Sequence, residues 1–182
     1  GRGGTSGIGV FSFDFGGFIV DGGHSLKSKS SFLPSSASQA KPPQLLAHYD
    51  FPDDWEILLV ILDSKNTVNG QKEVNIFQDY CPVPKNEVEQ TSHIIFMNMI
   101  PFLLERDLPA FGHSIDEIQK RGFKNVEVSL QSQQIRDLMD KLREIGAYGV
   151  GMSSFGPTVY SVFDKNNKHI VEEIKEYVGD MG

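Results

Sequence analysis

Apolar residues recur every three to four positions in several segments of the chain, which is the spacing of a helix with one buried face. The segment 132–145 is a clear example, because Ser132 can cap its first turn and Gly146 can end it. Pro101 lies inside the longest segment and should kink that helix. The predicted helices are 71–80, 87–106, 108–122, 132–145 and 167–178.

Other segments are short apolar runs, or alternate between apolar and polar residues as strands do. The run 55–62 is apolar almost throughout and predicts a central strand buried on both faces. An apolar run beginning at Tyr148 and the alternating run 158–163 are joined by a short loop, so they should pair as a hairpin. With another short strand at 45–49, the pattern predicts an α+β fold, an antiparallel sheet with helices packed on one face.

The first part of the chain leaves two interpretations open. Residues 10–20 alternate around Gly16-Gly17, which is typical of a hairpin, but a short helix ending at Gly16 also fits. Residues 25–43 are rich in Ser, Lys, Ala and Pro and predict a long loop or linker. We therefore divide the chain into 1–43 and 44–182. Because it opens in a glycine-rich stretch without an initiator Met, we expect it to be the C-terminal part of a longer protein.

Composition excludes several classes of function. The 182 residues carry a net charge of −7, and without a basic block to neutralise phosphates, nucleic acid is not expected as a partner. The single cysteine, Cys81, excludes an internal disulfide framework and fits a reducing compartment. No apolar run approaches the roughly 18 residues of a membrane helix. We expect a cytoplasmic protein that does not bind membranes.

The stretch 148–163 is the leading candidate for chemistry. Its loop contains three glycines, which suit backbone that approaches a ligand closely or takes positive φ. Ser153 and Ser154 add hydroxyl donors, so the loop could form a nest of N–H groups for an anion. A tight strand connection without a ligand remains the alternative. The loop leads into a strand and lacks a Gly-Lys-Ser/Thr sequence, so it is neither a dinucleotide fingerprint nor a Walker loop.

Two further groups of residues are candidates for binding a phosphate or a cation. The opening loop 1–9 offers Arg2, Thr5 and Ser6 as phosphate donors, although a flexible terminus explains it equally well. Asp50, Asp53 and Asp54 could bind a cation, but turn formation explains them more simply, and we predict no metal ligands. The five histidines are scattered without metal spacing, and His24 stands out only because it follows a glycine pair.

Both glycine loops resemble those of the GHMP small-molecule kinase superfamily. Its third motif, a glycine loop near bound phosphates, is similar to Gly149-Val-Gly-Met-Ser-Ser-Phe-Gly-Pro-Thr-Val-Tyr. Its Ser-Gly-Ile-Asp segment is similar to Ser6-Gly-Ile-Gly, so Gly9 stands where the kinases have a catalytic aspartate. The resemblance implies the C-terminal half of that fold, which is ferredoxin-like. The missing aspartate argues against ordinary phosphoryl transfer to a hydroxyl.

The whole chain resembles one archaeal family more closely, the β-ribofuranosylaminobenzene 5′-phosphate synthases of the methanopterin pathway. The similar segments include Gly17-Phe-Ile-Val-Asp-Gly-Gly-His, Phe32-Leu-Pro-Ser-Ser-Ala-Ser and Asp50-Phe-Pro-Asp-Asp-Trp. This resemblance implies a pentosyltransferase that condenses phosphoribosyl pyrophosphate with 4-aminobenzoate or 4-hydroxybenzoate and releases carbon dioxide and pyrophosphate. It also implies Mg²⁺, with its ligands in a preceding half, and it is compatible with a homodimer.

The resemblance also assigns candidate residues. No catalytic residue is named outright, and Arg2, Asp21 and His24 are the candidates for orienting the sugar or the aromatic acid. A small-molecule kinase, or a non-catalytic ligand-binding or dimerisation module, remains the alternative function; by itself the chain should be inactive. The expected substrate- and phosphate-binding residues are Gly3, Gly4, Thr5, Ser6, Gly7, Gly149, Gly151, Met152, Ser153, Ser154 and Gly156.

Overall fold

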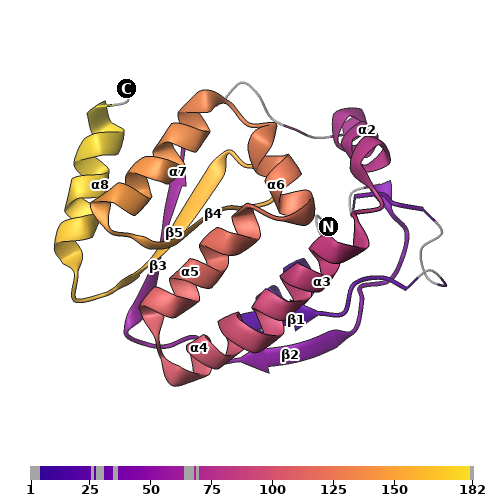
Figure 1. Ribbon diagram of the computed structural model, residues 1–182, viewed down its shortest axis with the longest axis horizontal. Coiled ribbons are helices and arrows are strands. Elements are labelled where there is room, and N and C mark those ends of the chain that lie inside the picture. Colours follow the sequence, from indigo (N-terminus) through magenta and orange to yellow (C-terminus); the bar gives the residue numbers. More distant parts are fainter. Residues whose placement is uncertain are drawn as a thin grey trace. The chain divides into compact units, whose positions relative to one another are not determined.

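The computed structural model describes residues 5–25, 27, 31–34, 37–63, 68 and 70–180 (Figure 1). Arg2, Gly3 and Gly4 therefore lie outside the described residues. The chain forms two compact units, one of residues 1–51 with 68–82 and one of 52–67 with 83–182. The first unit therefore includes residues 44–51 and 68–82, which the division predicted from the sequence, 1–43 and 44–182, had assigned to the second part.

The first unit contains a helix beside a two-stranded sheet, and a second helix. In the sheet β1 pairs antiparallel with β2, with Phe18 opposite Tyr49. The hairpin predicted over 10–20 is wrong, and the alternative short helix is confirmed. Phe11 and Phe15 alternate along the sequence but are also four apart, and their rings stack on one helix face with centroids 6.4 Å apart. The elements are α1 (Gly7–Phe15), β1 (Phe18–Asp21), β2 (Leu45–Tyr49) and α2 (Gly70–Tyr80).

The second unit is built on a three-stranded antiparallel sheet of β3 (Trp55–Ile61), β4 (Tyr148–Met152) and β5 (Thr158–Asp164), in the order β3-β5-β4. The predicted hairpin of the last two strands is confirmed. The prediction that 55–62 is a central strand is wrong. β3 lies at the edge of this sheet, and Ile57, Leu59 and Ile61 are each more than half exposed.

Helices fill the rest of the second unit. The predicted helix 87–106 is helical over most of its length, but a π-helical stretch interrupts it just before Pro101, which cannot donate a backbone hydrogen bond. The predicted helix 108–122 ends three residues early, and Gly122 instead begins a helix that the sequence analysis missed. The helical elements are α3 (Lys85–His93), η2 (Ile94–Met99), α4 (Ile100–Glu105), α5 (Leu108–Gln119), α6 (Gly122–Ser129), α7 (Gln133–Ile145) and α8 (Lys168–Asp180).

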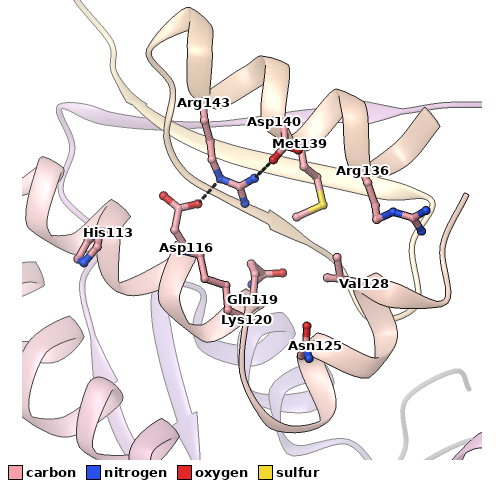
Figure 2. Close-up of a pocket in the computed structure, with 10 residues that line it drawn as sticks. All are labelled: His113, Asp116, Gln119, Lys120, Asn125, Val128, Arg136, Met139, Asp140 and Arg143. Carbon is pink, nitrogen blue, oxygen red and sulfur yellow. Dashed lines mark hydrogen bonds and ion pairs between the residues drawn. The ribbon is translucent and has the colours of Figure 1, made fainter. Parts of the chain in front are cut away.

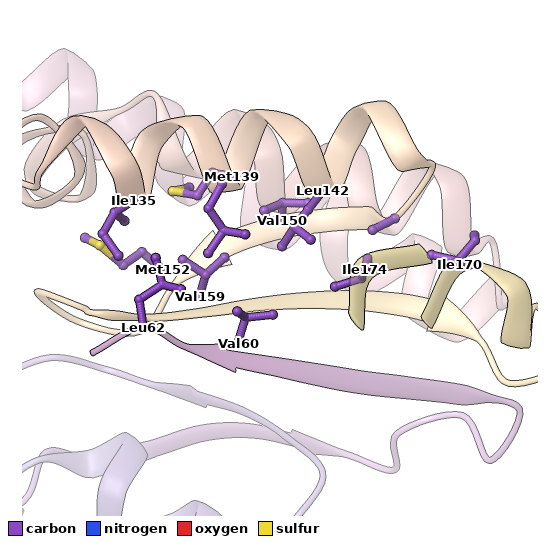
Figure 3. Packing of buried hydrophobic residues seen from close by; sticks show 12 residues of the cluster. Val60, Leu62, Ile135, Met139, Leu142, Val150, Met152, Val159, Ile170 and Ile174 are labelled. Atoms are coloured by element: carbon purple, nitrogen blue, oxygen red, sulfur yellow. The ribbon is translucent and has the colours of Figure 1, made fainter. Parts of the chain in front are cut away.

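The core of the second unit lies between the sheet and the helices α7 and α8, as Figure 3 shows. The apolar face predicted for α7 is fully buried, and Ser132 caps the helix through a hydrogen bond from the amide of Ile135 (3.4 Å). Gly146 ends it with φ of 101°. The α+β architecture with an antiparallel sheet is therefore confirmed. The main core residues are Val60, Ile135, Leu138, Leu142, Val150, Met152, Val159, Ile170 and Ile174.

Candidate functional site

Residues 153–157 form the loop of the β4–β5 hairpin. The amide of Ser153 donates to the carbonyl of Thr158 (2.9 Å), and the amide of Gly156 donates to the carbonyl of Ser153 (2.9 Å). Ser154 has φ of +48°, which is uncommon for a residue with a side chain. These bonds close the loop into one defined conformation, so its remaining donors point in fixed directions.

Four donors of this loop make no hydrogen bond within the described residues. They are the amides of Ser154 and Phe155 and the hydroxyls of Ser153 and Ser154. Both serines are exposed, whereas Phe155 and Met152 are buried and the amide of Met152 is already bonded. Of the predicted phosphate-binding residues in this unit, Ser153 and Ser154 therefore have donors available, and Phe155 adds an amide that the sequence analysis missed.

The glycines of the stretch have structural reasons of their own. Gly149 has φ of +57°, and a side chain there would lie 2.7 Å from Ile115 and 2.9 Å from the Cα of Gly112. A Cβ at Gly151 would lie 2.4 Å from Cζ of Tyr160, and Gly156 has φ of +72° beside Met152. A close approach of backbone to other protein atoms therefore accounts for all three glycines without a ligand. Their predicted contact with a phosphate stays a prediction.

Helix α6 holds the 153–157 loop in place through Lys124. The ammonium of Lys124 donates to the carbonyls of Met152 (3.1 Å) and Ser154 (3.3 Å), and it also forms an ion pair with Glu127. A lysine ammonium has three donors. Because all three are engaged, Lys124 holds the loop in place and has none left for a ligand.

Two further contacts hold the loop. The buried side chain of Gln131 donates to the carbonyl of Phe155, and the rings of Phe123 and Phe155 meet edge to face with centroids 5.9 Å apart. Sequence reasoning missed these supports together with α6. The Lys124-x-x-Glu127 spacing, typical of a helical ion pair, was the one local signal.

The free edge of β4 is covered by side chains instead of another strand. The amide of Val150 donates to Asp116 (3.2 Å), and the amide of Met152 donates to Gln119 (3.0 Å), both on α5. Arg143 of α7 donates to the carbonyl of Val150 (3.1 Å). An unpaired strand edge is prone to pair with other chains, and these bonds prevent that. They also fix the strand that leads into the 153–157 loop.

A groove of about 470 Å³ lies between α5, α6 and α7 (Figure 2). At one end Arg143 donates to Asp116 (2.8 Å) and to Asp140 (2.9 Å), so two carboxylates face its single positive charge. No residue of the groove was predicted as a site residue. The lining residues are His113, Asp116, Gln119, Lys120, Asn125, Val128, Arg136, Met139, Asp140 and Arg143.

In the first unit, Ser6 and Asp21 bind the beginning of α1. Ser6 accepts from the amide of Gly9 (3.2 Å), while Asp21 accepts from the amides of Ile8 (3.0 Å) and Gly23 (2.9 Å). Gly7 leaves no room for a side chain, because an added Cβ would lie 2.5 Å from the Asp21 carboxylate. Asp21 therefore orders the local backbone, and the first amides of α1 are already engaged.

The other candidates of the first unit are less informative. His24 donates through Nε2 to the carbonyl of Lys41 (3.0 Å), which ties two loops together. Thr5 lies in the turn that precedes α1 and has a partner of its own. The assignment of these residues to the sugar or the aromatic acid stays a prediction.

The described residues offer no group of three or more His, Cys, Asp or Glu side chains that would hold a metal ion. Asp54 is instead paired with Arg106, which holds the pKa of that carboxyl below its usual range, and the carbonyl of Asp53 accepts from Lys165 (2.8 Å). The described residues therefore do not by themselves fit a Mg²⁺ ion. None of the described helices is long and apolar enough to cross a membrane.

Comparison with known proteins agrees with this architecture. Residues 99–180 match the family described as GHMP kinases C terminal. A homoserine kinase from Cytophaga hutchinsonii superimposes with a TM-score of 0.52 over 76% of this chain and 41% of its own, and at 14% identity it supports the fold alone. The expected fold class is confirmed.

Closer relatives come from archaea and carry the name β-ribofuranosylphenol 5′-phosphate synthase. The Methanothermobacter thermautotrophicus protein is 54% identical over 98% of this chain and 54% of its own length. Those of Archaeoglobus fulgidus and Methanocaldococcus jannaschii are each 48% identical over the whole chain, and 56% and 55% of their lengths are covered. The expected resemblance is confirmed, and the chain spans about half the length of these relatives.

Proposed function

We propose that this chain, a homologue of the archaeal β-ribofuranosylphenol 5′-phosphate synthases, forms about half of such an enzyme. The observation that carries the proposal is 48–54% identity over at least 98% of the chain. The relatives' names specify a phenol as the ribosylated group. Of the two acceptors expected from the sequence, this favours 4-hydroxybenzoate over 4-aminobenzoate.

The proposed reaction balances without an added oxidant or reductant. The bond between ribose C1 and the pyrophosphate oxygen breaks, and the ring carbon that carries the carboxylate forms a bond to C1. The bond from that ring carbon to the carboxylate then breaks, carbon dioxide leaves, and its electron pair restores the aromatic ring. The ring supplies the electrons, so no general base is needed to begin the step.

The identity of residue 9 supports a synthase over a kinase. The kinases of this superfamily have an aspartate at the matching position, where a carboxylate can take a proton from an alcohol. Here Gly9 has no side chain, and its amide is bonded to Ser6 (3.2 Å). An enzyme whose nucleophile is an aromatic ring does not require that carboxylate.

The 153–157 loop is the proposed phosphate-binding element. Two hydroxyls and two amides without partners lie in succession on a loop held from below by Lys124, a combination suited to phosphate oxygens. In the full-length enzyme, Ser154→Ala should raise the KM for phosphoribosyl pyrophosphate more than it lowers kcat. Ser92→Ala on α3, whose hydroxyl bonds only to its own helix (2.8 Å), is the matched control. An unchanged KM in Ser154→Ala would remove the phosphate assignment.

The function itself is tested with a chimaera in which this chain replaces the matching segment of the Methanothermobacter protein. It is incubated with phosphoribosyl pyrophosphate, Mg²⁺ and either aromatic acid, and products are followed by mass spectrometry. We expect a ribosylated phenol from 4-hydroxybenzoate with loss of carbon dioxide. A folded chimaera that gives no product while the intact relative does, or that instead consumes ATP with a small alcohol, would contradict the proposal.

Three further properties belong to the same proposal. The chain alone should form no product, because it spans about half of its relatives. We place the enzyme in the cytoplasm, because a chain with a single cysteine, Cys81, fits a reducing compartment. Mg²⁺, held by residues outside the described part of this chain, and a homodimer are proposed from the resemblance. Metal removal and sedimentation analysis test them.

A further inference from the structure

The groove between α5, α6 and α7 contains donors that neither the core nor the hairpin loop uses (Figure 2). Its volume of about 470 Å³ lies within the range of small-molecule sites. Such a groove can be a packing gap between helices or a binding site, and its lining residues distinguish the two. Three side chains decide this: Gln119, Arg136 and Asn125.

Gln119 is 4% exposed, and its orientation is fixed by the fold. Its Oε1 must accept the amide of Met152 (3.0 Å), so its Nε2 faces the other way, toward the groove that it lines. This amide nitrogen has no hydrogen-bond partner within the described residues. The nitrogen is not fully enclosed by protein, so water or a ligand in the groove can accept its hydrogen bond.

Arg136 contributes a charge that the described residues do not balance. It donates to the carbonyls of Ser129 (3.3 Å) and Gln131 and to the side-chain oxygen of Gln133 (2.7 Å), all of them neutral acceptors. Arg143 at the other end of the groove differs, because two aspartates bind it. The Arg136 end of the groove is therefore electropositive and able to attract an anion.

Two more features shape the groove. Asn125 is exposed, lines the groove, and its side chain makes no hydrogen bond in the described part of the chain. Met139 and Val128 provide an apolar wall, and Figure 2 shows the thioether of Met139 among the polar groups. A thioether packs well against an aromatic ring. The groove thus combines one uncompensated cation, two neutral amides and an apolar surface.

We infer that this groove binds a small organic carboxylate, which the unbalanced charge of Arg136 attracts and whose apolar part packs against Met139 and Val128, while Gln119 and Asn125 line the same groove as neutral donors. A single uncompensated positive charge matches a monoanion better than a doubly charged phosphate. The groove is lined by residues other than those of the 153–157 loop, and the inference does not depend on the proposed synthase reaction. Its failure or success is therefore independent of that proposal.

The test uses the 182-residue chain and benzoate as the probe, with inorganic phosphate for comparison. Side-chain amide signals of Gln119 and Asn125 are followed by NMR during titration. Saturable shifts of both signals are expected with benzoate, and weaker ones with phosphate. No saturable shift at millimolar benzoate, or tighter binding of phosphate, would overturn the inference.

Variants locate the binding. Arg136→Gln and Asn125→Asp should each weaken benzoate binding about tenfold or more, since each removes or repels a carboxylate contact. Lys141→Gln on the same helix removes one positive charge outside the groove lining, where Lys141 bonds Glu144 (3.4 Å), and should bind as the unaltered chain does. Asn125 is exposed, so Asn125→Asp remains informative if Arg136→Gln fails to fold. Unchanged binding in folded Asn125→Asp or Arg136→Gln would contradict the inference.

Discussion

Helix α5 lies so close to strand β4 that even a methyl group at Gly112 has no room. A Cβ at this position would lie 2.7 Å from the backbone nitrogen of Gly149 and 2.7 Å from the Cβ of Tyr148. Neither atom can move away by a side-chain rotation. To restore an ordinary carbon contact, Gly112→Ala must push the helix back by about 0.7 Å.

The size of the effect follows from the bonds that join the same two elements. A retreat of that size stretches the contact between the amide of Val150 and Asp116, now 3.2 Å, beyond hydrogen-bond range, and it weakens that between Met152 and Gln119, now 3.0 Å. Losing a bond to a buried donor costs about 1–3 kcal/mol, whereas alanine in place of glycine favours a helix by about 1 kcal/mol. We expect a net loss of about 1 kcal/mol, or a Tm lower by about 2–4 °C.

Gly179→Ala is the matched control, because it makes the same chemical change in helix α8 where no atom lies within 4 Å. Only the helix preference acts there, so its Tm should be unchanged or slightly higher. Both variants are compared with the unaltered chain by thermal unfolding followed by circular dichroism. If Gly112→Ala proves as stable as Gly179→Ala, α5 does not pack on β4 as closely as described.

Three other changes test separate parts of the structure. Burial raises the pKa of Tyr160 to about 12 from 10.0, so the stability due to the neutral buried phenol is present below pH 10 and is lost as pH rises toward 12. The difference in unfolding free energy between the unaltered chain and Tyr160→Phe should therefore shift by about 1 kcal/mol from about pH 9 to about pH 11. Lys124→Met removes three donors under the hairpin loop and should cost about 1–2 kcal/mol by urea unfolding, less in Lys124→Arg. Leu138→Ala at a site with 0% exposure should cost about 3–5 kcal/mol by the same measurement.

Each of these has a clear contrary result. A pH-independent difference for Tyr160→Phe would mean that its hydroxyl is not buried. Equal stability of Lys124→Met and the unaltered chain would mean that α6 does not hold the loop. A loss below about 1 kcal/mol for Leu138→Ala would mean that α7 does not cover the sheet as described.

The parts of the fold that were predicted correctly have signals within one segment. Helix α7 carries its cap at Ser132, its end at Gly146 and its apolar face in between. Strand β3 shows the limit of such signals. Its composition indicates a strand, but its place at the edge of the sheet and the exposure of Ile57 depend on segments that lie elsewhere in the sequence. Local sequence patterns therefore predicted which segments form helices and strands better than they predicted which of these elements lie next to one another.

The candidate site divides in the same way. Ser153 and Ser154 were found because glycines and hydroxyls cluster in one loop. Lys124 and Gln119 were missed, since each bonds backbone about thirty residues away and that distance has no local signature. The glycines were interpreted as ligand contacts, but contacts with α5 and Tyr160 already account for Gly149 and Gly151.

The proposed synthase activity is tested most directly by following the carboxyl carbon of labelled 4-hydroxybenzoate in the chimaera with the Methanothermobacter protein. The account predicts one labelled carbon dioxide released for each pyrophosphate, and a product in which ribose C1 is bonded to carbon. Pyrophosphate released without labelled carbon dioxide, or ribose bonded to the phenol oxygen, would contradict it.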